Sequence, residues 1–118
     1  MTDRQQRDGL LPFGVALVAG PSMRPTLRDG DRVLVRYGAA LRPGRVALFE
    51  HPRHPGLLVL KRAVERRPEG WWMVSDNPFV ETDSRQYGAV PEELILGQVL
   101  CRLGWPRRQG PAQPAAAA

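Results

Sequence analysis

The chain has 118 residues, of which 42% are hydrophobic and 25% are charged, and its 17 basic and 12 acidic residues give a formal net charge of +5. This length allows one small domain with a single core, and the composition is ordinary for a globular protein. The arginines are spread along the chain and are not interleaved with aromatic residues, so we expect a solvated basic surface and no nucleic-acid groove.

The single cysteine and the short apolar runs indicate in which cellular compartment the protein is expected. Cys101 has no partner for an internal disulfide and fits a reducing compartment, so we expect a cytoplasmic protein. It lies in an apolar run and is expected in the core. A membrane-spanning helix needs about 20 apolar residues. The longest candidate, residues 10–20, is shorter and contains Pro12, so no span is predicted.

Both ends of the chain are predicted to be disordered. Residues 1–9 hold no apolar residue after Met1, and residues 105–118 are a low-complexity run rich in proline and alanine. The folded domain is therefore expected over residues 10–104.

The segments between these ends are typical of strands joined by short turns. Residues 13–19 are rich in valine and leucine and predict a first strand. Further strands are expected at 32–37, 45–50, 57–66, 71–75 and 95–103, with one helical turn at 91–94 and an irregular segment from 76 to 88. The fold class is thus mainly β: a small β-barrel or twisted β-ribbon domain with few or no helices.

Ser22 follows the first predicted strand and lies between two prolines. Pro21 and Pro25 fix their own φ and push the preceding residues toward extended geometry, which predicts a rigid turn. A serine held in this way can act as a nucleophile. It can equally be a turn-former whose hydroxyl bonds nearby backbone N–H groups.

Lys61 is the one lysine in a chain with 16 arginines. Arginine keeps its proton in a protein, whereas burial can make the lysine amine neutral. On the predicted strand, Lys61 shares a face with Val59 and Ala63, where burial would lower its pKa. The alternative is an edge-strand lysine whose amine reaches water.

Ser22 and Lys61 together are the components of a Ser-Lys hydrolase. Residues 22–27, Ser-Met-Arg-Pro-Thr-Leu, resemble the Ser-Met-x-Pro-Thr-Leu box of type I signal peptidases. Three segments similar to the family's further boxes follow in the same order, at 30–35, at 61–62, and at 76–77 with 83–90.

The resemblance implies a signal-peptidase-like fold and a serine endopeptidase. Ser22 would be the nucleophile, Lys61 the general base, and the Ser22 backbone N–H a donor to the oxyanion. No cofactor or metal is implied. The residues that would support the site are Met23, Pro25, Thr26, Asp76, Asn77, Asp83, Ser84 and Arg85.

Within this family, the chain most resembles the branch that matures nickel-type superoxide dismutase. The resemblance lies in the small size, the absence of a predicted span, the arginine-rich composition, and the run at 61–68 with Gly-Trp-Trp at 70–72. The implied partner is a protein substrate with an N-terminal leader, the dismutase precursor. Nucleic acid is not an expected partner.

The chain departs from the family pattern at two places. Gly20 stands where many members have a hydroxyl that helps to bind the oxyanion, and Glu81 stands where many have a serine that orients the lysine. A carboxylate beside Lys61 would favour the ammonium unless it points to solvent. Thr82 or Ser84 would then supply the hydroxyl. Replacement of the glycine at the start of the last box by Ser75 is a milder change.

Two motifs are assigned to structure first. Asp83 and Arg85 lie two residues apart, where charge-assisted hydrogen bonds can tie a loop. His51 and His54 each precede a proline in an irregular loop, without a nearby cysteine or carboxylate cluster. They predict a surface loop in preference to a metal site.

Two other functions stay open at this point. A self-cleaving repressor-type peptidase domain shares the dyad and the fold, but it would need a DNA-binding module that residues 1–9 are too short to supply. A non-catalytic peptide-binding module with a decayed site is suggested by Gly20 and Glu81.

Overall fold

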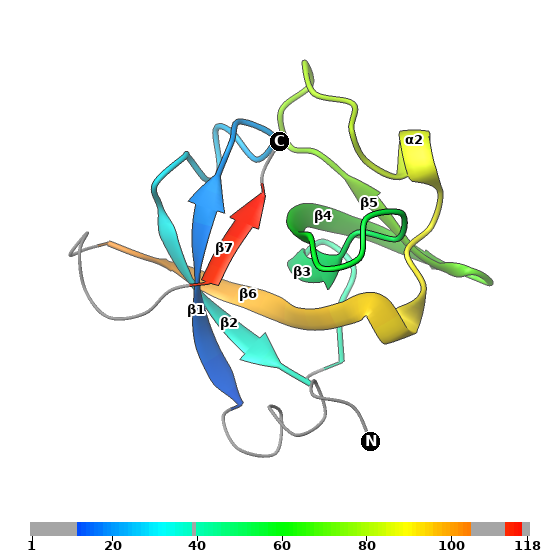
Figure 1. Cartoon of the computed structure of the whole chain (residues 1–118), viewed down its shortest axis with the longest axis horizontal. Coiled ribbons are helices and arrows are strands. Elements are labelled where there is room, and N and C mark those ends of the chain that lie inside the picture. Colours follow the sequence, from blue (N-terminus) through cyan, green and yellow to red (C-terminus); the bar gives the residue numbers. More distant parts are fainter. Residues whose placement is uncertain (1–11, 39, 105–112, 117–118) are drawn as a thin grey trace.

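The computed structural model describes residues 12–38, 40–104 and 113–116, and within them the chain forms one sheet of seven strands with two short helical segments (Figure 1). The mainly β fold class is therefore confirmed. The strands are β1 (Phe13–Ala19), β2 (Arg32–Tyr37), β3 (Val46–Glu50), β4 (Leu58–Arg67), β5 (Gly70–Val74), β6 (Ile95–Leu103) and β7 (Gln113–Ala116). The helical segments are α2 (Ser84–Tyr87) and the 3-10 turn η1 (Glu92–Leu94).

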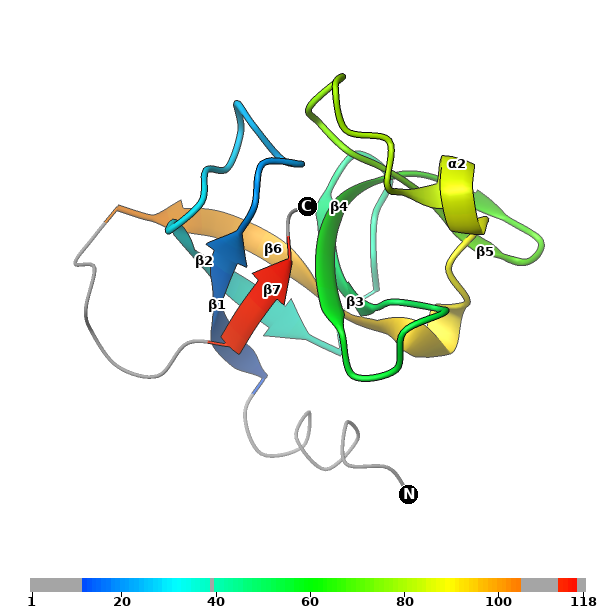
Figure 2. The same cartoon turned by 45° about the horizontal axis from the view of Figure 1, so that its top comes forward.

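The sheet curls until it closes on itself. Its strand order is β3-β6-β2-β1-β7-β4-β5, and β3 also pairs with β4, so the first six strands in this order form a ring and β5 extends outward from β4. The neighbours are antiparallel except at β7, which runs parallel to β1 on one side and to β4 on the other. Figure 2 shows β7 between these two strands.

The core consists of two clusters of buried side chains, and the central strands contribute to both. Leu48 of β3 and Leu60 of β4 belong to the first cluster, whereas their neighbours Phe49 and Val59 belong to the second. This division follows from the alternation of side chains along a strand. Lys61 has the same parity as Val59, so its side chain is directed to the second cluster.

The predicted strands agree closely with the observed ones. The strands at 13–19, 32–37 and 95–103 have the predicted bounds. β3 begins one residue later than predicted, β4 is shifted by one residue toward the carboxyl end, and β5 is shifted by one residue toward the amino end. The helical turn expected at 91–94 is η1. The segment predicted to be irregular up to residue 88 contains α2, so that prediction is wrong for residues 84–87. Asp83 caps this turn because its side chain accepts a hydrogen bond from Arg85 N.

The strand β7 lies inside the segment 105–118 that was predicted to be disordered. For residues 113–116 that prediction is wrong, because the edges of β1 and β4 offer backbone partners to a segment with little strand propensity of its own. The rest of this segment apart from these four residues, and the predicted tail 1–9, lie outside the described residues.

Cys101 was expected in the core, and this expectation is wrong. Its side chain is exposed. The pairing of β6 with β2 shifts register between Leu34 and Val35, and β6 has no fully buried residue after Val99. The end of the strand therefore extends past the core.

Within the described ranges, no helix is long and apolar enough to cross a membrane.

Candidate active site

Ser22 lies in the turn that follows β1, as predicted, and is completely buried, with 0% of its surface exposed. Two neighbours fix the turn: Met23 and Leu27 insert their side chains into the first core cluster, and Leu27 N donates to Met23 O at 2.8 Å. The Ser22 Oγ has no hydrogen-bond partner. Pro25, on the other side of the turn, is exposed.

The turn is held from outside by Asn77, which is distant in sequence. Asn77 N donates to Ser22 O at 2.8 Å, and Asn77 Nδ2 donates to Pro21 O at 3.0 Å. Thr26 Oγ1 also donates to Asp76 Oδ2 at 2.7 Å. The Asp-Asn box thus positions the two carbonyls at and before Ser22.

Arg62 connects this assembly to β4. Its Nε donates to Asp76 Oδ1 at 3.0 Å, its Nη2 donates to Asp76 Oδ2, and its Nη1 donates to Gly44 O at 2.9 Å. Burial by itself raises the pKa of Asp76, but the hydrogen bonds from Arg62 and Thr26 outweigh it and hold the pKa below its usual value. Asp76 therefore stays a carboxylate and keeps the turn attached to β4.

Lys61 precedes Arg62 on β4, and its side chain has 0% of its surface exposed. The burial expected from its apolar neighbours is confirmed. Its Nζ donates to Ser75 Oγ at 3.1 Å. Burial lowers the pKa of Lys61 to about 8; the nearby Asp83 charge opposes this shift and the Arg85 charge adds to it. About a tenth of the amine is therefore neutral at pH 7, and about half is neutral at pH 8.

A bulge decides which residue Lys61 meets. In the β4–β5 hairpin, Glu65 pairs with Trp72, but the pairing shifts by one residue before Ala63, which pairs with Met73. Continued to Lys61, the shifted register places Ser75 opposite the lysine, whereas the unshifted register would place Asp76 there. Bulges of this kind often redirect side chains beside active sites. Here the Lys61 amine meets the Ser75 hydroxyl, and the Asp76 carboxylate binds Arg62.

The hydroxyl beside Lys61 was expected from Thr82 or Ser84, but the hydroxyl that its Nζ binds is that of Ser75. Ser84 Oγ accepts from Met73 N at 2.8 Å and so fastens α2 to β5. Glu81 is exposed, and the carboxylate whose charge raises the pKa of Lys61 is Asp83. The signal that could have found Ser75 is a hydroxyl residue directly after β5, in a hairpin partner of the lysine strand.

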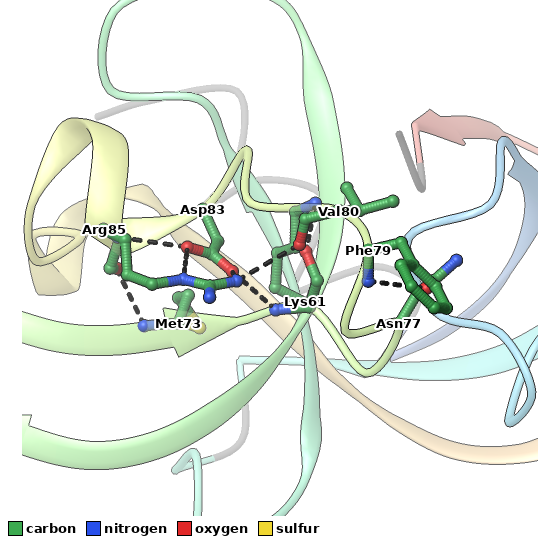
Figure 3. Close-up of polar contacts among 9 residues, drawn as sticks. Lys61, Met73, Asn77, Phe79, Val80, Asp83 and Arg85 are labelled. Atoms are coloured by element: carbon green, nitrogen blue, oxygen red, sulfur yellow. Dashed lines mark hydrogen bonds and ion pairs between the residues drawn. The ribbon is translucent and has the colours of Figure 1, made fainter.

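Asp83 and Arg85 form the charge-assisted pair that their spacing predicted (Figure 3). Arg85 Nε donates to Asp83 Oδ1 at 2.9 Å and Arg85 Nη2 to Asp83 Oδ2 at 2.8 Å, while Ser75 N donates to the same Oδ2 at 2.8 Å. Arg85 Nη2 also donates to Val80 O at 3.1 Å. Burial raises the pKa of Asp83, but these bonds outweigh it and lower the pKa overall. The pair fixes the backbone of Ser75.

The sequence boxes at 22–27, 61–62 and 76–77 with 83–90 are therefore brought together, but the two expected catalytic side chains are not hydrogen-bonded to each other. Lys61 Nζ is bound to Ser75 Oγ, and Ser22 Oγ is unpartnered. Beside the Ser22 turn lies a hollow of about 430 Å³, lined by Gly20, Pro21, Arg24, Arg28 and Asp29.

His51 and His54 lie in the loop after β3, with ring centroids 4.5 Å apart. His51 Nδ1 accepts a hydrogen bond from Arg53 N at 3.0 Å, and burial together with the nearby His54, Arg53 and Lys61 charges lowers the pKa of His51. In the part of the chain that the structure describes, no three His, Cys, Asp or Glu residues are grouped as metal ligands.

Comparison with known families assigns the chain to a class of peptidases. A family model described as Peptidase S24-like matches residues 12–100, and the chain belongs to this family. Curated relatives include mitochondrial inner membrane protease subunit 1 of Xenopus tropicalis, 30% identical over 116 residues that cover 78% of this chain and 69% of the relative. The Arabidopsis thaliana protein named mitochondrial ATP-independent inner membrane protease subunit 1a is 35% identical over 117 residues. These residues cover 75% of this chain and 68% of the relative.

Proposed function

We propose that the chain is a serine endopeptidase that removes an N-terminal leader from a precursor protein, with Ser22 as nucleophile and Lys61 as general base. The observation that supports this best is the burial of both groups: a hydroxyl without a partner and an amine whose pKa is lowered to about 8. An unsatisfied buried hydroxyl costs about 1–3 kcal/mol, so its presence in a peptidase fold favours a chemical role.

In the proposed reaction, neutral Lys61 takes the Ser22 proton as Oγ attacks the scissile carbonyl, and later gives this proton to the leaving amine. Water then hydrolyses the acyl-enzyme. Because Ser22 Oγ holds no hydrogen bond, it breaks none when it turns toward the amine. The Ser22 N–H is the donor proposed for the oxyanion. Gly20 has no side chain to add, and its own N–H is bound to Asp29 Oδ1 at 2.9 Å.

Ser75 is proposed as the residue that orients Lys61. Replacing Ser75 with alanine is expected to lower kcat/KM about 10- to 100-fold, because a misplaced base reacts poorly. The apparent pKa of the rate profile should also fall, since the hydroxyl oxygen that stabilises the ammonium is lost. Ser75→Thr keeps a hydroxyl and should restore most of the activity. A Ser75→Ala profile identical to that of the wild type would contradict this role.

The pH dependence of cleavage follows from the lysine. Because the neutral amine is the active form, kcat/KM should rise about tenfold per pH unit below pH 8 and level off above it. Initial rates on one leader peptide between pH 6 and pH 10 measure this directly. A rate that is already constant from pH 6 upward would exclude Lys61 as the base.

The first test of the function is incubation of the purified chain with leader-containing precursors, with mass analysis of the products. The resemblance of the sequence to the dismutase-maturing branch makes the nickel-type superoxide dismutase precursor the substrate that we propose to assay first. We also propose the cytoplasm as the compartment, because a single cysteine forms no internal disulfide and fits a reducing environment. Peptides that bind but are never cut would favour a non-catalytic binding module.

A further inference from the structure

The strand β7 fills a slot between two strands that both lead to the candidate site. It runs parallel to β1, with pairs from Ala16 with Gln113 to Ala19 with Ala116, and it pairs with β4 where Val59 meets Ala116. We call the β1 edge at residues 16–19 together with the β4 edge at Val59 the peptide slot. Figure 2 shows that β7 lies between these two edges.

The register directs the slot toward Ser22 and Lys61. Ala116 is level with Ala19, three residues before Ser22, and with Val59, two residues before Lys61. A strand advances about 3.3 Å per residue, so an extended peptide that continued along the slot would arrive at both side chains within a few residues. Both are fully buried in this structure, and a substrate carbonyl therefore reaches Ser22 Oγ only after part of the structure moves.

β7 is the strand best suited to move. It is only four residues long, and its register with β4 consists of a single pair, whereas β3 pairs with β4 along five residues. Pro114 is exposed and has no N–H to donate, and Ala115, although 1% exposed, contributes only a methyl group to the core. Elements with so little buried apolar surface open most easily.

We propose that β7 occupies the peptide slot in competition with substrate, so that the chain holds its own site closed until a substrate strand takes the place of β7. This inference rests on the proposed function for the identity of the competitor. The substrate strand would run parallel to β1 and carry a small side chain at the position of Ala115, where the slot leaves room for a methyl group. The apparent affinity for substrate is then reduced by the fraction of molecules in which β7 is docked.

Binding of the chain's own segment tests the slot without any need for catalysis. A fluorescent peptide with the sequence of residues 110–118 is titrated into a Ser22→Ala chain that ends at Gly104 and into the full-length Ser22→Ala chain. We expect saturable binding to the shortened chain and at least tenfold weaker binding to the full chain. The same peptide with Glu at the position of Ala115 should not bind. Equal binding to both chains, or none to a folded shortened chain, would overturn the proposal.

Two point variants keep the test valid if the shortened chain does not fold. Ala115→Glu in the full chain places a charge at a buried position and should release β7, whereas Pro114→Glu places the same charge at an exposed position. Ala115→Glu should bind the peptide at least tenfold more tightly and show a correspondingly lower KM. Equal peptide affinities and equal KM values for Ala115→Glu and Pro114→Glu would overturn the proposal.

The outcomes also separate this inference from the proposed function. Peptide binding that depends on Ala115, without cleavage of any precursor, would retain the slot and reject the enzyme. Cleavage whose KM is the same with and without β7 would retain the enzyme and reject the competition.

Discussion

Replacing Lys61 with methionine is expected to reduce cleavage about 1000-fold and, at the same time, to stabilise the protein at neutral pH by about 1–3 kcal/mol. The loss of activity follows from removal of the proposed base. The gain in stability follows because the wild-type chain buries an amine whose charged form is penalised by desolvation. Methionine keeps similar bulk without the charge.

The sign of the stability effect can be checked against pH. The pKa of Lys61 is about 8 in the folded chain and about 10.4 in an unfolded one, so between these values the unfolded chain binds more protons and stability rises with pH. The loss of stability caused by burying the charged Lys61 amine is thus complete below pH 8 and absent above about pH 10.5. Thermal unfolding of wild type and Lys61→Met should show a smaller difference in stability between the two proteins at pH 10 than at pH 7.

Lys61→Arg serves as the matched control for this experiment. Arginine keeps the charge and does not lose its proton, so this variant should be inactive and less stable than wild type at both pH values. Retained cleavage in Lys61→Arg would contradict the role of Lys61 as base. Equal destabilisation by methionine and arginine would instead mean that packing, and not charge, determines the effect.

The second large effect is expected at Asp83. Asp83→Ala should lower the free energy of unfolding by about 3–5 kcal/mol, because it removes the partner of Arg85 and leaves the buried Ser75 N–H unsatisfied. Urea unfolding at pH 7 measures this loss. It should be accompanied by lower activity, since Ser75 loses the contact that fixes its backbone.

Asp76→Ala provides the comparison for Asp83→Ala. The Asp76 side chain is 16% exposed, whereas that of Asp83 is completely buried, so water can replace part of the lost Arg62 contact. A cost of about 1–2 kcal/mol is expected for Asp76→Ala. If Asp83→Ala costs no more than this, the Asp83–Arg85 pair does not have the structural role assigned to it.

Much of the sheet could be predicted because its strands carry local signals. Runs of aliphatic or aromatic residues bounded by turn residues identified β1 to β6 to within about one residue. The strand β7 has no such signal: Gln-Pro-Ala-Ala contains no β-branched or aromatic residue, and its pairing comes entirely from β1 and β4. α2 was missed because a single turn depends on the Asp83 cap and not on a repeating pattern.

The candidate site could be predicted in its residue types and less well in its contacts. Ser22 and Lys61 stand in recognisable motifs, and the burial of Lys61 follows from its neighbours on β4. The partner of Lys61 could not be deduced, because it depends on one extra residue in β4 near position 64 that brings Ser75 opposite the amine. Such a bulge has no clear sequence signature in this hairpin, and the family pattern directed attention to Thr82 and Ser84.

The attachment of the Ser22 turn to Asn77 has a consequence for the order of assembly. Ribosomes release the amino-terminal half first, yet the hydrogen bonds that position the carbonyls of Pro21 and Ser22 come from a residue 55 or more positions later. A nascent chain that has not yet reached Asn77 can build the β1–β2 hairpin but not the assembled Ser22 turn. Synthesis itself thus delays completion of the candidate site until the carboxyl-terminal half has emerged.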